Sequence, residues 1–185
     1  GGTAARLPAA TRRGVTVFNA PFSNTRSVVE LVIAEIIALT RRLVDKNREM
    51  HAGVWSKSAV GAHEVRGRRL GIIGYGNIGS QLSVLGENLG MTVGFYDTAD
   101  RLALGNARRI QSLEELLGWA DVVTLHVDGR PDNRGLFGES EFAAMRPGSL
   151  FLNLSRGFVV DHGALRAHIE SGHIAGAAVD VFLEE

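Results

Sequence analysis

Short apolar runs alternate with longer amphipathic stretches along most of the chain. Five runs fit strands that are buried on both faces: residues 70–73, 92–96, 122–127, 149–154 and 177–182. Four stretches carry apolar residues at helical spacing: residues 77–89, 113–117, 139–145 and 162–171. Strands and helices that alternate in this way predict an α/β fold with a doubly wound parallel sheet and helices on both of its faces.

The first third of the chain has a different pattern. Residues 15–18 predict a short strand, which the turn residues Asn19 and Pro21 would close. Residues 25–50 contain no Gly or Pro and predict one long helix, with apolar residues on more than one face. We expect such a helix to be buried on several sides, within the domain or against a second subunit. Residues 54–67 are mixed in character and predict a loop that contains Trp55.

Composition and charge exclude several classes of protein. Lys plus Arg and Asp plus Glu both number 20, so the formal net charge is zero, which argues against nucleic acid or an anionic membrane as the main partner. The absence of cysteine excludes a disulfide framework and a thiol nucleophile, and no pattern predicts a metal site. No stretch has the length of a membrane span or the form of a signal peptide. We therefore expect a soluble, cytoplasmic protein.

A glycine-rich turn at residues 74–79 is the strongest local signal, because it follows an apolar strand and opens a helix. In such a turn Gly74 permits the sharp reversal, Gly76 lets the backbone approach a pyrophosphate, and Gly79 allows close packing of helix on strand. The amides and the dipole of the helix N-terminus favour an anion there. The turn therefore predicts a Rossmann-type dinucleotide site.

Asp97 follows the next predicted strand, 23 residues after Gly74. That spacing is typical of the acid that accepts hydrogen bonds from the adenosine ribose of a dinucleotide. A carboxylate there repels a 2′-phosphate, and the nearest basic residue that follows is Arg101, so the sequence favours NAD over NADP. The alternative is that Asp97 only caps the turn after the strand.

Arg156 follows the predicted strand at residues 149–154, on the carboxyl side of the sheet, where open α/β folds bind ligands. Its planar guanidinium suits a substrate carboxylate. From this segment alone, a surface arginine in an ion pair is the alternative interpretation.

Several segments resemble a known family. Residues 70–79 and 145–161 together look like the paired signatures of the D-isomer-specific 2-hydroxyacid dehydrogenases, and residues 178–185 resemble the third block of that family. Residues 18–28 and 102–107 are similar in particular to the bacterial branch that oxidises 3-phosphoglycerate. The resemblance covers nearly the whole chain. It implies NAD as cofactor and a small 2-hydroxy acid as substrate, 3-phosphoglycerate in that branch.

The resemblance also implies roles for single residues. Arg156 would hold the substrate carboxylate, and Glu185 would pair with the catalytic histidine. Without the resemblance, His126 and Asp180 read equally well as residues that are simply hydrogen-bonded within the fold. The cofactor-binding residues predicted from the glycine turn, from the spacing of Asp97 and from the resemblance are together Gly74, Gly76, Asn77, Ile78, Gly79, Asp97, His126, Leu154, Ser155, Arg156 and Asp180.

The chain departs from the family pattern in three respects. Leu154 is bulkier than the residue usual at its position, and Asp128 stands where a proline is common. The catalytic histidine of the family lies downstream of the position of Glu185. We expect residues 1–18 to be the end of a substrate domain and residues 19–185 to be the NAD-binding domain, so the chain is expected to be a fragment without that histidine.

Two other functions are compatible with this sequence. The chain could belong to a sister dehydrogenase that acts on glyoxylate, hydroxypyruvate, lactate or formate, or to an NAD-sensing module like the corepressors that share this fold. We also expect at least a homodimer, formed through residues 24–55 with Trp55 as an aromatic anchor.

Overall fold

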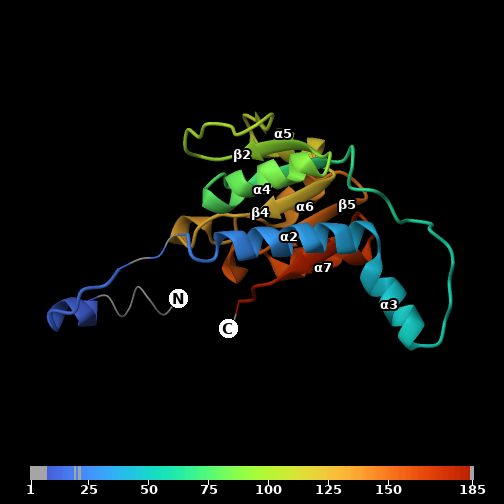
Figure 1. The fold of residues 1–185 in the computed structure, drawn as a ribbon, viewed down its shortest axis with the longest axis horizontal. Helices are drawn as coiled ribbons and strands as arrows, with labels where there is room; N and C mark the ends of the chain where they lie inside the picture. The colour runs from blue at the N-terminus through green and yellow to red at the C-terminus, as the bar shows by residue number, and fades with distance from the viewer. Residues whose placement is uncertain (1–7, 19, 21, 184–185) are drawn as a thin grey trace.

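The computed structural model describes residues 8–18, 20 and 22–183, and in that part of the chain six parallel strands form one sheet (Figure 1). The order across the sheet is β3-β2-β1-β4-β5-β6. The strands are β1 (Arg69–Ile73), β2 (Thr92–Tyr96), β3 (Arg108–Arg109), β4 (Val122–Leu125), β5 (Ser149–Asn153) and β6 (Ile174–Val179). The chain moves outward from β1 in one direction and then returns to β4 on the other side. The predicted doubly wound Rossmann-type fold is confirmed.

Helices cover both faces of this sheet. The helices are α2 (Thr25–Thr40), α3 (Leu43–His51), α4 (Asn77–Asn88), α5 (Leu113–Trp119), α6 (Glu139–Ala144) and α7 (His162–Glu170), with short 3-10 turns η1 (Pro131–Asn133) and η2 (Gly157–Val159). On one face, α2 and α4 pack against each other and against the sheet. On the other face lie α5, α6 and α7.

The hydrophobic core has two parts because successive strand residues point to opposite faces. In β1, Ile72 packs with the residues under α2 and α4, whereas Ile73 packs with those under α5, α6 and α7. Both parts contain large side chains that are fully buried, such as Leu82 in the first part and Phe142 and Phe151 in the second. The two-sided burial explains why the strands read as continuous apolar runs.

Two of the predicted strands have other bounds in the structure, and one short strand was not predicted. The last strand is β6 at Ile174–Val179 and not residues 177–182, because its pairing with β5 starts soon after the turn at Gly172 and ends at Val179. The strand predicted at residues 122–127 ends at Leu125. The short strand β3 was not predicted, since its two arginines carry no hydrophobic pattern.

The prediction of a strand at residues 15–18 is wrong. These residues have no regular secondary structure, and residues 8–12 before them form a helical turn. Val15, Val17 and Phe18 are exposed, so no apolar contact compensates for ordering the segment as a strand. Figure 1 shows this N-terminal segment leading away from the body of the molecule.

The helix predicted at residues 25–50 is also wrong as a single element. It breaks after Thr40, and Arg42 has a left-handed backbone conformation with φ of 54°. Residues 60–63 hold the break: the His63 N–H donates to the Thr40 carbonyl at 2.9 Å, and Arg42 Nη1 donates to the Val60 carbonyl at 3.3 Å. A tertiary contact therefore ends α2 where the local sequence contains no stop signal.

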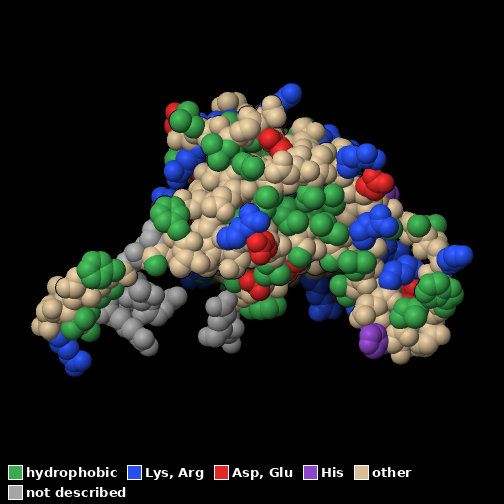
Figure 2. All heavy atoms as spheres, viewed as in Figure 1, with side chains coloured by type: hydrophobic (Ala, Val, Ile, Leu, Met, Phe, Trp, Pro, Cys, Tyr) green, Lys and Arg blue, Asp and Glu red, His purple; other side chains and the backbone are tan. Residues whose placement is uncertain are grey.

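After this break, α3 and the loop at residues 52–64, which we call the arm, project from the body (Figure 1). Six large hydrophobic residues of the arm are more than half exposed: Leu43, Val44, Met50, Val54, Trp55 and Val60. Figure 2 shows hydrophobic side chains at the end of the arm and over the outer face of the helices. No helix in the described ranges combines the length and the apolarity that crossing a bilayer requires. A cytoplasmic location stays a prediction.

Candidate functional site

A cavity of about 230 Å³ opens at the carboxyl ends of β1, β2 and β4. The order of the sheet places this cavity at the point where the chain reverses its winding, which is where open α/β sheets bind ligands. Its lining residues are Ile73, Gly74, Gly76, Tyr96, Asp97, Thr98, Arg101, Leu113, His126, Val127, Asp128, Arg130, Asn133 and Leu136.

The three glycines of the turn face different constraints. Gly74 has φ of +92°, and a Cβ there would lie 2.6 Å from the carbonyl oxygen of His126. A Cβ on Gly79 would lie 2.3 Å from the carbonyl oxygen of Gly74, so the start of α4 packs directly on the end of β1. A Cβ on Gly76 would meet no atom within 4 Å. Protein packing therefore explains Gly74 and Gly79, whereas the space at Gly76 suits a closely bound ligand.

The start of α4 offers unused hydrogen-bond donors. The helix begins at Asn77, and its cap residue Gly76 has no side chain that could bond to the first amides. The first amides of any helix lack intrahelical acceptors and carry the positive end of the dipole. Asn77, Ile78 and Gly79 therefore present donors beside the open space at Gly76, an arrangement that fits a pyrophosphate.

Asp97 lies directly after β2, with its side chain mostly buried at the cavity wall. Its Oδ2 accepts a hydrogen bond from the Tyr75 amide at 2.7 Å, and its Oδ1 accepts one from the Ala99 amide at 2.8 Å. Arg101 Nε lies 3.6 Å from Oδ2. The carboxylate thus caps the turn after the strand and also faces the cavity, and its role in binding the ribose stays a prediction.

His126 follows β4 and borders the same cavity. Its Nε2 lies 3.0 Å from Thr124 Oγ1, whereas its Nδ1 is sealed from solvent without a hydrogen-bond partner. Burial lowers the pKa of His126 to about 4, so the imidazole is neutral at physiological pH. One ring nitrogen is thus satisfied within the fold and the other is not.

The loop after β4 supplies cavity residues that the sequence did not single out for binding. Asp128 holds this loop in shape: it accepts hydrogen bonds from Arg130 Nε at 2.8 and 2.9 Å and from Asn133 Nδ2 at 3.0 Å. Hydrogen bonding from Arg130 lowers the pKa of Asp128. The signal that could have found these residues is the turn chemistry at residues 128–133, where Asp, Gly, Pro and Asn follow a buried strand.

A second group of predicted residues lies at the ends of β5 and β6. Asn153, fully buried, organises it: its Oδ1 accepts hydrogen bonds from the Ser155 amide and hydroxyl, its Nδ2 donates to the Arg156 carbonyl, and its carbonyl accepts from the Asp180 amide. Leu154 and Ser155 are buried beside it. The sequence did not single out Asn153.

Arg156 is exposed at the start of η2. Its Nη1 donates to the Ser155 carbonyl at 2.6 Å, and no ion pair of Arg156 is found within the described ranges. The alternative of a surface ion pair is therefore not seen there. A Cβ on Gly129 would lie 3.5 Å from Arg156 Nε, so the guanidinium reaches the loop after β4 that walls the cavity.

Glu35 of α2 is a further acid near this second group. Burial and then the charge of Asp180 raise the pKa of Glu35, and its Oε2 is buried without a partner. Asp180 itself is exposed. In the sequence, Glu35 only interrupts an apolar stretch of helix, so nothing in the local pattern connects it with a strand that begins almost 140 residues later.

The structure thus divides the predicted residues between two neighbouring places on one edge of the sheet. Gly74, Gly76, Asp97 and His126 line the cavity. Leu154, Ser155 and Asp180 lie at the ends of β5 and β6 and do not line it. Glu185 lies outside the described residues, and its predicted role stays a prediction.

Comparison with solved structures supports the same architecture. The TT0316 protein from Thermus thermophilus matches all of this chain and 59% of its own chain, with a TM-score of 0.88 at 32% identity. The holo form of Rhodotorula graminis D-mandelate dehydrogenase matches with a TM-score of 0.85 at 31% identity, over 97% of this chain and 55% of its own. An NAD-dependent formate dehydrogenase from Staphylococcus aureus, in complex with NAD, matches with a TM-score of 0.86 at 29% identity. The match covers 97% of this chain and 54% of that one.

Sequence comparison gives the family. Two proteins named D-3-phosphoglycerate dehydrogenase, from Haemophilus influenzae and Escherichia coli, are each 54% identical to this chain over 95% and 97% of its length. The chain spans less than half of these relatives, 43% and 44%. Residues 33–185 match the family described as "D-isomer specific 2-hydroxyacid dehydrogenase, NAD binding domain". The chain therefore belongs to the D-isomer specific 2-hydroxyacid dehydrogenases and contains their NAD-binding domain.

Proposed function

We propose that this chain binds NAD in the cavity and serves an enzyme that oxidises 3-phosphoglycerate to 3-phosphohydroxypyruvate, the entry to L-serine synthesis. The names and the identity of the relatives support this substrate. The observation that carries the cofactor assignment is the open space at Gly76, beside the donors of α4 and within a cavity that Asp97 borders.

The pyrophosphate would lie over Gly76 and the first amides of α4. The adenosine ribose would meet Asp97, and the adenine would lie against the apolar wall that includes Val127 and Leu136. The nicotinamide end would then reach the ends of β5 and β6, near Ser155 and Asp180. His126, neutral and placed between these two ends, can give or accept a hydrogen bond without adding a charge.

NAD, when bound, supplies the hydride acceptor for the substrate carbon that carries the hydroxyl group. Arg156 would hold the substrate carboxylate, since its exposed guanidinium has no ion pair within the described ranges and presents a planar pair of donors. Glu185 would hydrogen-bond to a histidine of the whole enzyme and raise the pKa of that imidazole, which takes up the hydroxyl proton.

Calorimetric titration of the chain with NAD and NADP tests the cofactor site. We expect NAD to bind more tightly, because Asp97 repels a 2′-phosphate, and we expect Asp97→Ala to narrow the difference. Equal affinity of the unchanged chain for both cofactors would exclude Asp97 as the discriminating residue.

The reaction is tested in the whole enzyme with a panel of 2-hydroxy acids. Arg156→Lys should lower kcat/KM for 3-phosphoglycerate by about tenfold or more and leave NAD affinity largely unchanged, because the charge stays while the bidentate grip is lost. Arg166→Lys, in an exposed pair with Glu170 on α7, is the matched control. Preference for another 2-hydroxy acid would point to a sister dehydrogenase, and NAD binding without any oxidation would point to a sensing module.

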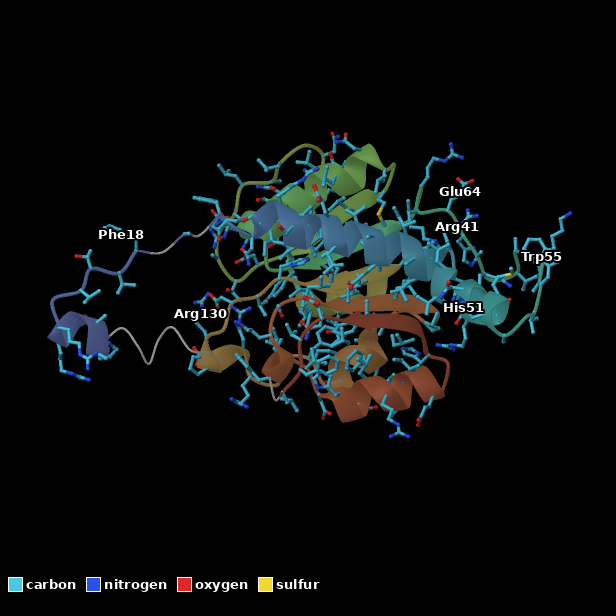
Figure 3. The ribbon with its side chains drawn as sticks, turned by 60° about the horizontal axis from the view of Figure 1, so that its bottom comes forward. Phe18, Arg41, His51, Trp55, Glu64 and Arg130 are labelled. Carbon is cyan, nitrogen blue, oxygen red and sulfur yellow. The ribbon has the colours of Figure 1, made fainter. Side chains whose placement is uncertain are left out.

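We also propose that the protein is at least a homodimer through α2 and the arm. Within this chain, α2 buries one stripe only: Thr25, Val29, Val32, Ile36 and Thr40. Figure 3 shows Trp55 at the far end of the arm, on the other side of the body from Arg130 at the cavity. A second copy would cover the exposed apolar residues of the arm and leave the cavity open. Sedimentation at rising concentration tests this, and Trp55→Ala should weaken the association.

A further inference from the structure

The loop at residues 97–107 forms one wall of the cavity, to which it contributes Asp97, Thr98 and Arg101. Most of this loop has little to bury: Leu102, for example, is 92% exposed. A loop with so few apolar contacts is expected to open easily unless hydrogen bonds fix it. The position of the wall therefore depends on what anchors the loop to the body.

Tyr75, inside the glycine turn, contacts both ends of this loop. Its amide donates to Asp97 Oδ2 at 2.7 Å, and its hydroxyl oxygen accepts a hydrogen bond from the Leu104 amide at 3.1 Å. Its ring stacks on Phe95 of β2 with a centroid distance of 3.7 Å, and the residue is only 3% exposed. One side chain thus joins the turn that faces the pyrophosphate to the loop that faces the ribose.

The protons in this contact can be assigned. Ser83 Oγ donates its single proton to the Ser80 carbonyl at 2.8 Å, so it can only accept from the Tyr75 hydroxyl, which lies 2.6 Å away. The Tyr75 hydroxyl therefore donates to Ser83 and accepts from Leu104. The result is a directional chain of hydrogen bonds, largely buried, from the loop through Tyr75 and Ser83 into α4, in which each bond polarises the next.

Glu87 of α4 provides a second anchor. Its Oε1 accepts a hydrogen bond from the Asn106 amide at 2.8 Å. Gly105 has φ of +60°, and a Cβ there would lie 2.4 Å from Glu87 Oε2, so glycine allows the loop to approach the carboxylate. Residues 104–106 are thus held at two points, both of which lead to α4.

We propose that Tyr75 is a positioning residue for the adenosine half of the dinucleotide: its hydroxyl holds the 97–107 loop in the binding conformation before the ligand arrives. This inference rests on the proposed NAD site. The observed affinity equals the affinity for the binding conformation multiplied by the fraction of molecules whose loop already has that conformation. The hydroxyl of Tyr75 therefore contributes to affinity without contacting the ligand.

The test compares Tyr75→Phe with Ser83→Ala in the full chain, with NAD and ADP-ribose as calorimetric probes. Both variants remove one hydroxyl from the same network, but only Tyr75→Phe releases the Leu104 amide. Removal of one hydrogen bond predicts an affinity loss of about two- to fivefold for Tyr75→Phe, equal for the two probes because both contain the adenosine half. Ser83→Ala keeps the bond from the Leu104 amide to the Tyr75 hydroxyl and loses only its polarisation by Ser83, so it should lose clearly less affinity for both probes than Tyr75→Phe. Amide hydrogen exchange of residues 98–107 should speed up in Tyr75→Phe alone.

The outcomes separate this inference from the proposed function. If the unchanged chain binds neither NAD nor ADP-ribose, the proposed site itself is wrong. If the unchanged chain binds both probes and Tyr75→Phe binds them as tightly as the unchanged chain does, the positioning role is wrong. It is also wrong if Ser83→Ala loses as much affinity as Tyr75→Phe. A larger loss for NAD than for ADP-ribose would also overturn it, because the effect would then lie outside the adenosine half. Melting temperatures of both variants show whether a change in affinity merely follows a change in stability.

Discussion

Acidification should destabilise this protein through His126 in particular. The pKa of His126 falls from its ordinary value of 6.5 to about 4 because the imidazole is buried. The unfolded chain therefore binds a proton on this residue between pH 6.5 and pH 4, whereas the folded protein does not. A histidine that is buried in its neutral form contributes stability that is fully present above the unfolded pKa and is lost as the pH falls below it.

The size of the effect follows from the two pKa values. The full difference of about 2.5 pKa units corresponds to roughly 3.5 kcal/mol, since one pKa unit is about 1.4 kcal/mol. At pH 5, about 1.5 units below the unfolded pKa, the loss is roughly 2 kcal/mol, and at pH 7.5 it is close to zero. That loss is a large part of the stability of a domain of this size.

Chemical denaturation at pH 7.5 and pH 5.0, followed by tryptophan fluorescence, measures this loss. His126→Gln removes the titrating group, so the free energy of unfolding of the unchanged chain should fall by roughly 2 kcal/mol more than that of the variant between the two pH values. His51→Gln controls for the loss of one histidine, since His51 is exposed at the end of α3. An NMR titration of the imidazole of His126 gives its folded pKa directly.

Two results would contradict this reasoning. The first is a measured pKa of His126 near 6.5, which would mean that water reaches Nδ1 through the cavity. The second is an equal loss of stability in the unchanged chain and in His126→Gln.

Two further predictions concern packing and a buried acid. Gly79→Ala should cost about 1–3 kcal/mol of stability and weaken NAD binding, because the new Cβ would lie 2.3 Å from the Gly74 carbonyl oxygen. The control Gly118→Ala, in α5, should be neutral or slightly stabilising, because its Cβ would meet open space. Equal melting temperatures for the two variants would contradict this prediction. Glu35→Gln should gain stability relative to the unchanged chain as the pH rises from 4 to 8. Burial and the charge of Asp180 raise the pKa of Glu35 in the folded protein. As the pH rises, the unfolded chain therefore loses this proton at a lower pH than the folded protein does, and the buried carboxylate then destabilises the fold. A stability difference between variant and unchanged chain that does not depend on pH would exclude this cause.

The central part of the fold could be predicted from the sequence because its signals are local. Strands β1, β2 and β5 are apolar on both faces, and the glycine turn between β1 and α4 needs no distant contact to be recognised. The break after Thr40 could not be predicted, because it depends on a hydrogen bond from His63, 23 residues away in sequence. The prediction of a strand at residues 15–18 was wrong for a related reason: an apolar segment forms a strand only where a neighbouring strand pairs with it.

The candidate site divides in the same way. Gly74, Gly76 and Asp97 stand at fixed spacings along one βαβ unit, so the sequence alone brings them to one cavity. Glu35 reaches its place by a tertiary contact, the packing of α2 near Asp180, which leaves no periodic signal in the sequence. Arg130 is held by a local ion pair with Asp128, two residues before it, and only the turn residues at 128–133 signal this loop.

The arm connects these observations with assembly. The arm buries little of itself against its own domain, yet two hydrogen bonds hold its base. The His63 N–H donates to the Thr40 carbonyl, and Arg42 Nη1 donates to the Val60 carbonyl. Unpartnered apolar side chains on an ordered projection are costly in water, and the cost is recovered only if another surface covers them. The relatives are more than twice as long as this chain, so a covering surface can come from a second copy or from their additional residues. Sedimentation separates these two, because only self-association through the arm responds to concentration and to Trp55→Ala.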